Sequence, residues 1–465
     1  MNTYRPHITS IETRDLLNED LAIHDIKRKY DTKPLDSKAY VKIPLYLYIA
    51  EFVRQQKESI ASKYTRAFRT PIPEIHAQLK TRPHFEDLQE IFSHGNVKEL
   101  QKLGEGTQGK VIKIHYPKKT KEYVISSRRF ESIVRLKHRP LDMALKLSIV
   151  GGSDLENYIE AIEARDEKDM KYYRKKFERA MASKTDESSV DVIGSYWSTQ
   201  LCNQGLSPGV GPLMYYAERV RGKEKGHDVV YQAMWGQHLN GLPQRRWRWG
   251  IPEFESMLTQ ICLLLGTAQR LGNFVHNDLH TSNIMYERVP RSTHVYYEEY
   301  VPGGPNRFYA IPTYGKLWKI IDFGRVHLKL GSLSVTSDRV KDTMGKTYDP
   351  TRKSIDLHRF ILAFLQDDAF PDQPNSKSWR RLMKEGLDGL RDKYDKCQQQ
   401  SNSEKRHDCI DSEIIGGEKG GFADPTMPES RMTPYHWVKT FGILYAFEAK
   451  EGSIPKDAIV FPLLV

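Results

Sequence analysis

Two short polar motifs, set among apolar residues, constrain this chain most. The first spans residues 276–283 and has the pattern H-x-D-x-x-x-x-N, and the second is D-F-G at residues 322–324. In this order they provide two carboxylates and one side-chain amide. Phosphoryl transfer from a nucleotide uses one carboxylate to orient the attacking hydroxyl, and the amide with the other carboxylate to hold magnesium. Either motif alone is common, but the two together predict this chemistry.

The first motif supplies the candidate catalytic residue, Asp278. We expect it to accept or orient the proton of an attacking hydroxyl. Asn283 is expected to offer a neutral oxygen to Mg²⁺. We interpret His276 as a structural residue that braces the loop backbone. His280 stays open between two interpretations, since it could approach the transferred phosphate or only face solvent.

The second motif supplies the other candidate metal ligand, Asp322. Residues 317–321 predict a strand directly before it, and Gly324 permits a tight turn after it. A carboxylate at a strand end suits Mg²⁺, which takes few protein ligands and several phosphate oxygens. For D-F-G alone, an ordinary strand-end turn is the alternative, but the motif at 276–283 favours the metal site.

A glycine-rich segment at 104–109 has the pattern G-x-G-x-x-G between two segments with strand-like spacing. Glycines let the backbone approach phosphates without Cβ clashes. A dinucleotide-binding turn shares the pattern but needs a helix directly afterwards, whereas residues 110–114 alternate like a strand. We therefore expect a hairpin over the nucleotide. The expected ATP-binding residues here are Leu103, Gly104, Glu105, Gly106, Thr107, Gln108, Gly109, Lys110 and Val111.

Lys146 lies on a short apolar segment that we expect to be a strand. A lysine buried there needs an anionic partner, and triphosphate oxygens would supply one. A lysine at a strand edge that points to solvent is the alternative. A lysine held in this way is expected to pair with a carboxylate on a helix. Asp191, Glu187 and Glu178 are the candidates, and we favour Asp191.

Length and composition narrow the classes of protein to which this chain can belong. The 465 residues allow two or three domains or one large two-lobed domain. The net charge of +11 favours acidic partners such as nucleotides, with a basic solvated surface as the alternative. The four cysteines lack C-x-x-C spacing, which predicts neither a zinc site nor a disulfide framework. With no signal-peptide core and no apolar run long enough for a bilayer, we expect an intracellular, cytoplasmic protein without a membrane partner.

The patterns divide the part of the chain before the polar motifs into two regions. Residues 1–95 contain no chemical motif, and their helical spacing at 45–63 predicts a partly helical N-terminal extension. Residues 96–235 contain the glycine segment and two expected insertions. One is basic, at 117–140, and the other is charged and helical, at 155–185.

The remaining region, residues 236–465, contains both polar motifs. A helix is expected at 254–271, with Pro252 near its start and Gly272 at its end. An aromatic insertion rich in proline and glycine is expected at 286–316. The polar segment at 398–430 is expected to be a long flexible loop.

The motifs, taken in this order, resemble those of the eukaryotic-type protein kinase superfamily, over about residues 99–365. The resemblance implies an α+β, two-lobed fold, with a small antiparallel-sheet lobe at 96–235 and a mainly helical lobe at 236–465. It implies ATP- and Mg²⁺-dependent transfer of the γ-phosphate to a Ser or Thr hydroxyl of a protein, with Mn²⁺ as a substitute metal. The motifs look most like those of serine/threonine kinases of large double-stranded DNA viruses. That resemblance implies that the protein is located in the host cytoplasm or in the virion.

The same resemblance assigns further roles. Asp356 looks like the aspartate that braces the catalytic loop, and Phe323 and Gly324 belong to the metal-binding motif. Residues 229–235 resemble the strand that enters the hinge between the lobes, with adenine bonded to the backbone near residues 232–234.

Three departures from the family pattern carry predictions. Asn277 stands where an arginine usually pairs with a phosphorylated segment, so phosphorylation there is not expected to be the activating switch. His280 replaces a common lysine, which predicts weaker neutralisation of the γ-phosphate and low turnover. The chain after Asp322 lacks an A-P-E motif, which bears on the protein substrate more than on the ATP chemistry.

The sequence favours three other functions less. A small-molecule kinase shares the first motif but usually lacks D-F-G. A pseudokinase-like scaffold is disfavoured because all four catalytic positions are filled. A nucleic-acid-binding protein using residues 117–140 is not supported, since no aromatic-interleaved or groove-reading motif is present.

Overall fold

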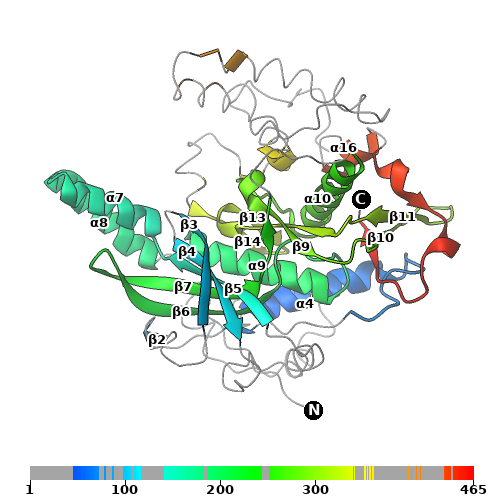
Figure 1. The fold of residues 1–465 in the computed structure, drawn as a ribbon, viewed down its shortest axis with the longest axis horizontal. Helices are drawn as coiled ribbons and strands as arrows, with labels where there is room; N and C mark the ends of the chain where they lie inside the picture. The colour runs from blue at the N-terminus through cyan, green and yellow to red at the C-terminus, as the bar shows by residue number, and fades with distance from the viewer. Residues whose placement is uncertain are drawn as a thin grey trace.

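The computed structural model describes most of the chain between residues 45 and 464. The described residues are 45–72, 78–79, 86–87, 98–106, 109–116, 141–182, 186–242, 251–338, 340, 350–351, 353, 355–357, 359–360, 396–397, 399–400, 405, 409, 434–440 and 443–464. Within them the fold is mixed α+β, with mainly antiparallel sheets and several helices, which confirms the predicted class (Figure 1). The insertion expected at 117–140 and most of the loop expected at 398–430 lie outside the described residues.

The largest sheet has seven strands in the order β1-β6-β7-β5-β4-β3, and β2 also pairs with β6. The bounds are β1 Gln78–Leu79, β2 Glu86–Asp87, β3 Lys98–Gly106, β4 Gly109–Tyr116, β5 Leu141–Ile149, β6 Met214–Glu224 and β7 His227–Gln237. β1 and β2 run parallel to β6, and the other pairs are antiparallel. The hairpin of β3 and β4 closes at Gly106 and Gly109. A strand therefore follows the glycines, as predicted, and not the helix of a dinucleotide-binding turn.

Three helices lie between β5 and β6. Their bounds are α7 Gly152–Glu163, α8 Glu167–Ala182 and α9 Glu187–Asn203. Helices α7 and α8 lie side by side and project from the sheet, where the charged helical insertion was expected (Figure 1). Between them the chain turns at Arg165, whose φ is 57°. The N-terminus of α9 is capped by Asp186, whose carboxylate accepts hydrogen bonds from the backbone N–H groups of Ser188 and Ser189.

Helix α9 is buried along nearly its whole length. It packs against β6 and β7 on one side and against α4, Leu45–Ala61, on another. The Trp197 ring of α9 stacks on Phe274, with ring centroids 5.6 Å apart, and Phe274 in turn meets Phe323 edge-on at 5.7 Å. Because burial of apolar surface is the main stabilising term in folding, this continuous core fixes α9 relative to the D-F-G segment.

Helix α10, Ile251–Gly272, precedes the first polar motif, with Pro252 in its first turn and Gly272 at its end, as predicted. A three-stranded sheet of order β12-β9-β8 carries the flanks of both motifs. Its bounds are β8 Asn240–Gly241, β9 Ile284–Arg288 and β12 Lys316–Ile320. Strand β9 follows the first motif and β12 precedes the second. Their antiparallel pairing, with Ile284 opposite Ile320, therefore brings the two motifs side by side.

The insertion expected at 286–316 contains a hairpin that pairs with the end of the chain. Strands β10 His294–Glu299 and β11 Arg307–Pro312 join β15 Glu448–Ala449 and β16 Val460–Leu463 in the order β15-β11-β10-β16. The fully buried Glu298 carboxylate accepts hydrogen bonds from the backbone N–H groups of Thr65 and Ala67, at 2.6 and 2.7 Å. The insertion therefore ties residues near both ends of the described chain to its middle.

The other described elements are η1 Thr281–Asn283, η2 Phe323–Arg325, β13 His327–Leu330, β14 Leu333–Thr336, α16 Pro434–Thr440, η6 Leu444–Phe447 and η7 Glu451–Ser453. Among the described residues of 236–465, strands β8 to β16 stand beside helices α10 and α16. The mainly helical lobe that the resemblance implied for residues 236–465 stays a prediction, because much of the segment from 341 to 433 lies outside the described residues.

The cysteine prediction was wrong in part. Cys397 and Cys409 form a disulfide, with their Cα atoms 5.4 Å apart, while Cys202 and Cys262 are free thiols. Sequence spacing does not report which cysteines approach each other, so the bond was not predicted. In the described residues, no helix combines the length and the apolar character needed to cross a bilayer.

Candidate active site

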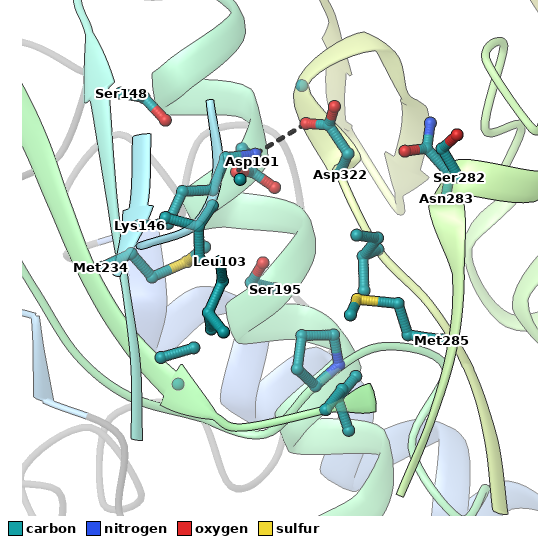
Figure 2. Close-up of a pocket in the computed structure, with 18 of the residues that line it drawn as sticks. Leu103, Lys146, Ser148, Asp191, Ser195, Met234, Ser282, Asn283, Met285 and Asp322 are labelled. Atoms are coloured by element: carbon teal, nitrogen blue, oxygen red, sulfur yellow. Dashed lines mark hydrogen bonds and ion pairs between the residues drawn. The ribbon is translucent and has the colours of Figure 1, made fainter. Parts of the chain in front are cut away.

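The two motifs and the glycine hairpin border one cavity of about 1300 Å³, large enough for a nucleotide (Figure 2). Figure 2 shows Lys146 and Met234 on one side of the cavity and Asn283 and Asp322 on the other, with Asp191 between them. The predicted site residues that line it are Leu103, Gly104, Glu105, Gly109, Lys110, Val111, Lys146, Asp191, Asp278, Asn283, Asp322 and Gly324.

The other predicted site residues that the structure describes are not among those that line the cavity. His276, Phe323 and Asp356 are fully buried. Gly106 closes the hairpin opposite Gly109. His280 is exposed, and Thr107 and Gln108 lie outside the described residues.

Gly109 is a position where the hairpin requires glycine. Its φ is 150°, and a Cβ there would lie 1.8 Å from the Leu147 carbonyl oxygen. The hairpin therefore lies directly against β5. In that pairing Val111 stands opposite Lys146, so the hairpin and the lysine border the same space.

Lys146 is held between two carboxylates. Its Nζ lies 2.7 Å from Asp191 Oδ2 and 2.7 Å from Asp322 Oδ1. Burial opposes the charged ammonium, but the charges of the two carboxylates outweigh it and raise the pKa of Lys146. The lysine is therefore a cation aimed at the cavity and not a solvent-facing lysine at a strand edge.

Asp191 connects this lysine to the second motif. Its carboxylate is nearly fully buried, and its Oδ1 accepts a hydrogen bond of 2.8 Å from the backbone N–H of Phe323. Burial raises the pKa of Asp191, while the Lys146 charge opposes that rise. The other two candidate partners are engaged elsewhere, since Glu187 pairs with Arg325 and Glu178 with Arg174.

Asp322 adopts a left-handed backbone conformation, with φ 65° and ψ 71°. Asp tolerates this conformation better than most residues. The Phe323 side chain that follows is closely packed, because a Cβ on Gly211 would lie 2.7 Å from its ring and a Cβ on Gly194 would lie 2.7 Å from the Phe323 Cβ. The ammonium of Lys146 lowers the pKa of Asp322 to about 2. The packed ring and the ion pair together fix this carboxylate at the cavity edge.

Protonation of Asp322 at low pH is expected to lower the free energy of unfolding. Its pKa of about 2 lies below the ordinary 3.8, so its contribution to stability is present above the unfolded-state pKa. That contribution is lost as the pH falls through the window from about 4 to about 2. Between about pH 5 and pH 2.5, we expect wild type to lose about 1 kcal/mol more unfolding free energy than Asp322→Asn, after allowance for the partly exposed carboxylate. Urea unfolding measures this, and equal losses in both proteins would contradict it.

The loop of the first motif is braced by Asp356, which the structure places beneath it. The Asp356 carboxylate accepts hydrogen bonds from the backbone N–H groups of His276, at 2.7 Å, and Asn277, at 3.0 Å. His276 Nε2 lies 2.9 Å from the Ile321 carbonyl oxygen and so donates to it, while Nδ1 accepts from the Asp278 N–H. Burial lowers the pKa of His276, which keeps the ring neutral. His276 therefore joins the two motifs as a structural residue.

Asn277 stabilises the backbone at the position where the kinases that the motifs resemble usually have arginine. It is fully buried with φ 62°, a conformation that Asn accepts readily. Its side-chain amide donates to the carbonyl oxygens of Val275, Arg325 and Pro350, at 3.1 to 3.3 Å. The loop is thus tied to the segment after D-F-G by a neutral group.

Asp278 is held by two arginines that sequence reasoning missed. Arg359 Nη1 lies 3.1 Å from Asp278 Oδ1, and Arg325 Nη1 lies 3.4 Å from Oδ2. Two signals could have suggested them. Arg325 directly follows D-F-G, and Arg359 comes one helical turn after Asp356.

Asn283 and Asp322 have the donor set for Mg²⁺. The Asn283 amide nitrogen donates to the Asp278 carbonyl oxygen, at 2.8 Å, and lies 3.1 Å from His280 Nε2. Both amide hydrogens are thereby engaged, which leaves the amide oxygen for a cation. The backbone N–H of Ile321 donates to the Asn283 carbonyl oxygen at 2.9 Å, so the two candidate ligands are fixed together. A neutral oxygen beside a carboxylate suits a hard cation.

Strand β7 and the residues just after it contribute to the cavity wall. The lining includes Met234, Gly236, Gln237 and Leu239. Gln232 is buried away from the cavity, and its side-chain oxygen accepts from Arg219 Nε. Met234 belongs to the expected contact region at 232–234, and the adenine contact itself stays a prediction.

A scan against protein-family models and a search of curated proteins found no match to this chain. Its candidate function therefore depends on the site itself.

Proposed function

We propose that this chain is an ATP- and Mg²⁺-dependent phosphotransferase of the eukaryotic-type protein kinase superfamily, and that it acts on serine or threonine hydroxyls of proteins. The two-lobed arrangement is part of this proposal. The seven-stranded sheet with α9 forms the smaller lobe, and α10 with the three-stranded sheet belongs to the larger lobe. ATP binds in the cavity between them.

One observation carries the proposal: side chains from distant parts of the chain converge on a single cavity beneath a glycine hairpin. They are Lys146, Asp191, Asp278, Asn283 and Asp322. Charged clusters also occur as structural networks, so clustering alone is weak support. The meeting of these five groups, a cation, an amide and three carboxylates, in one nucleotide-sized cavity supports phosphoryl transfer much more specifically.

The proposed roles follow from each group's chemistry. Asp278 orients the substrate hydroxyl and takes its proton. Lys146, kept cationic by Asp191, contacts phosphate oxygens. Asn283 and Asp322 hold the metal, which when bound neutralises phosphate charge. The apolar wall near Met234, with the backbone of residues 236–239, receives the adenine ring.

Binding and transfer assays test the proposal. Mg·ATP should raise the melting temperature of the full-length protein, because a ligand present at about 100 times its Kd adds about 2.7 kcal/mol. ATP with a chelator should have a smaller effect. Labelled ATP should transfer its γ-phosphate to casein or histone, and Asp322→Asn should abolish that transfer. A wild-type protein that neither binds Mg·ATP nor transfers phosphate would refute the proposal.

A further inference from the structure

Arg325 connects the helix that carries Asp191 to the candidate catalytic base. Its Nε lies 2.9 Å from Glu187 Oε1, and its Nη1 lies 3.4 Å from Asp278 Oδ2. Glu187 stands one turn before Asp191 on α9, so the two carboxylates lie on the same face of that helix. Lys146 and Arg325 are thus bound by neighbouring carboxylates of one rigid element.

Arg359 contacts the other oxygen of the Asp278 carboxylate. Its Nη1 lies 3.1 Å from Asp278 Oδ1, so each oxygen of the carboxylate has its own guanidinium. The side chains involved are 10% to 27% exposed, which places the pairs well below the freely solvated surface. Ion pairs are screened less there than on an open surface. Burial opposes the charge of Arg325, but Asp278 and Glu187 outweigh it and raise its pKa.

Asn277 occupies the position of the arginine that would bind a phosphate on the following segment, and its neutral side-chain amide donates to three backbone carbonyls. A phosphate is an anion that would draw guanidinium groups together. Here Glu187 and Asp278 already supply the negative charges that hold Arg325.

We propose that Arg325 and Arg359 are positioning residues that hold Asp278 and α9 in the assembled arrangement without phosphorylation of the chain. This rests on the proposed phosphotransferase function. Arg325 holds α9 in place through its ion pair with Glu187, and it holds the Asp278 carboxylate through its second ion pair. Arg359 fixes the other oxygen of Asp278, so the carboxylate faces the cavity in one orientation.

The test uses the full-length protein after phosphatase treatment, with mass spectrometry to verify that it carries no phosphate. The kcat and the KM for ATP are measured for wild type, Arg325→Gln, Arg325→Lys, Arg359→Gln and Glu187→Gln, with casein and histone as acceptors. Arg174→Gln is the matched control, because Arg174 also pairs with a helical glutamate but lies on the exposed face of α8. Mg·ATP thermal shifts report whether each variant keeps the nucleotide site.

We expect unphosphorylated wild type to keep its kcat within about two-fold. Arg325→Gln should lower kcat by about 10- to 100-fold, with a KM for ATP and a thermal shift close to wild type, because a misplaced base slows the chemical step. Arg325→Lys should not restore kcat, since one ammonium cannot bridge Glu187 and Asp278 as a guanidinium does. Arg359→Gln and Glu187→Gln should lower kcat in the same way, and Arg174→Gln should not.

Three results would overturn the inference. They are a loss of activity on phosphatase treatment, a wild-type kcat in Arg325→Gln, and an increased kcat in that variant, which would mean that the arginines block the base. If Arg325→Gln does not fold, Glu187→Gln decides, because it removes only one of the two partners of Arg325. A wild type without Mg·ATP binding or turnover would instead refute the proposed function itself.

Discussion

Replacing Asp278 with asparagine is expected to lower kcat for γ-phosphate transfer by about 10³-fold, within the range that a positioned base contributes. Asparagine keeps the shape of the side chain but cannot accept a proton or pair with Arg325 and Arg359. The nucleotide contacts come from other residues, so the KM for ATP and the Mg·ATP thermal shift should change little. Steady-state kinetics with labelled ATP measure the effect.

The control for this variant is Asp228→Asn, which alters an aspartate whose side chain is 90% exposed on β7. It should leave kcat unchanged. If Asp278→Asn instead keeps the wild-type kcat while the protein transfers phosphate, another group serves as the base and the assignment of Asp278 fails.

The second large effect is expected from Lys146→Met, which keeps the length of the side chain but removes its charge. Asp191 and Asp322 would then face each other without a cation. Removing one partner of a fully buried ion pair costs about 3–5 kcal/mol, and because Lys146 and Asp322 are partly exposed we expect about 2–3 kcal/mol less unfolding free energy. The kcat should fall on the order of 100-fold, since a cation on the transferred phosphate is lost.

Lys223→Met is the matched control, because Lys223 lies in the same sheet and pairs with Asp228 at 4.0 Å while 75% exposed. Such surface pairs contribute about 0–1 kcal/mol. Urea unfolding of both variants should therefore separate them clearly. A Lys146→Met protein as stable as Lys223→Met would mean that the two carboxylates do not depend on the ammonium.

Local sequence pattern was sufficient for much of the fold. The alternation after Gly109 predicted a strand, and the apolar periodicity before His276 predicted α10 with its proline start and glycine end. Both were confirmed, because period and capping chemistry depend on neighbouring residues. The strand pairing of residues 448–449 and 460–463 with the insertion was not predicted, since it joins segments far apart in the chain.

For the candidate site, too, the sequence predicted some features and the tertiary structure alone showed others. By itself, the sequence determined which residue types are available for phosphate, metal and proton, because side-chain chemistry and motif order can be read along the chain. The tertiary structure alone decided which carboxylate meets Lys146 and which cations meet Asp278. Three acidic residues were candidates for the lysine, and only the packing of α9 against the D-F-G segment selects Asp191 and directs Glu187 to Arg325. Such pairings depend on distances of a few ångströms between distant segments, which residue order does not encode.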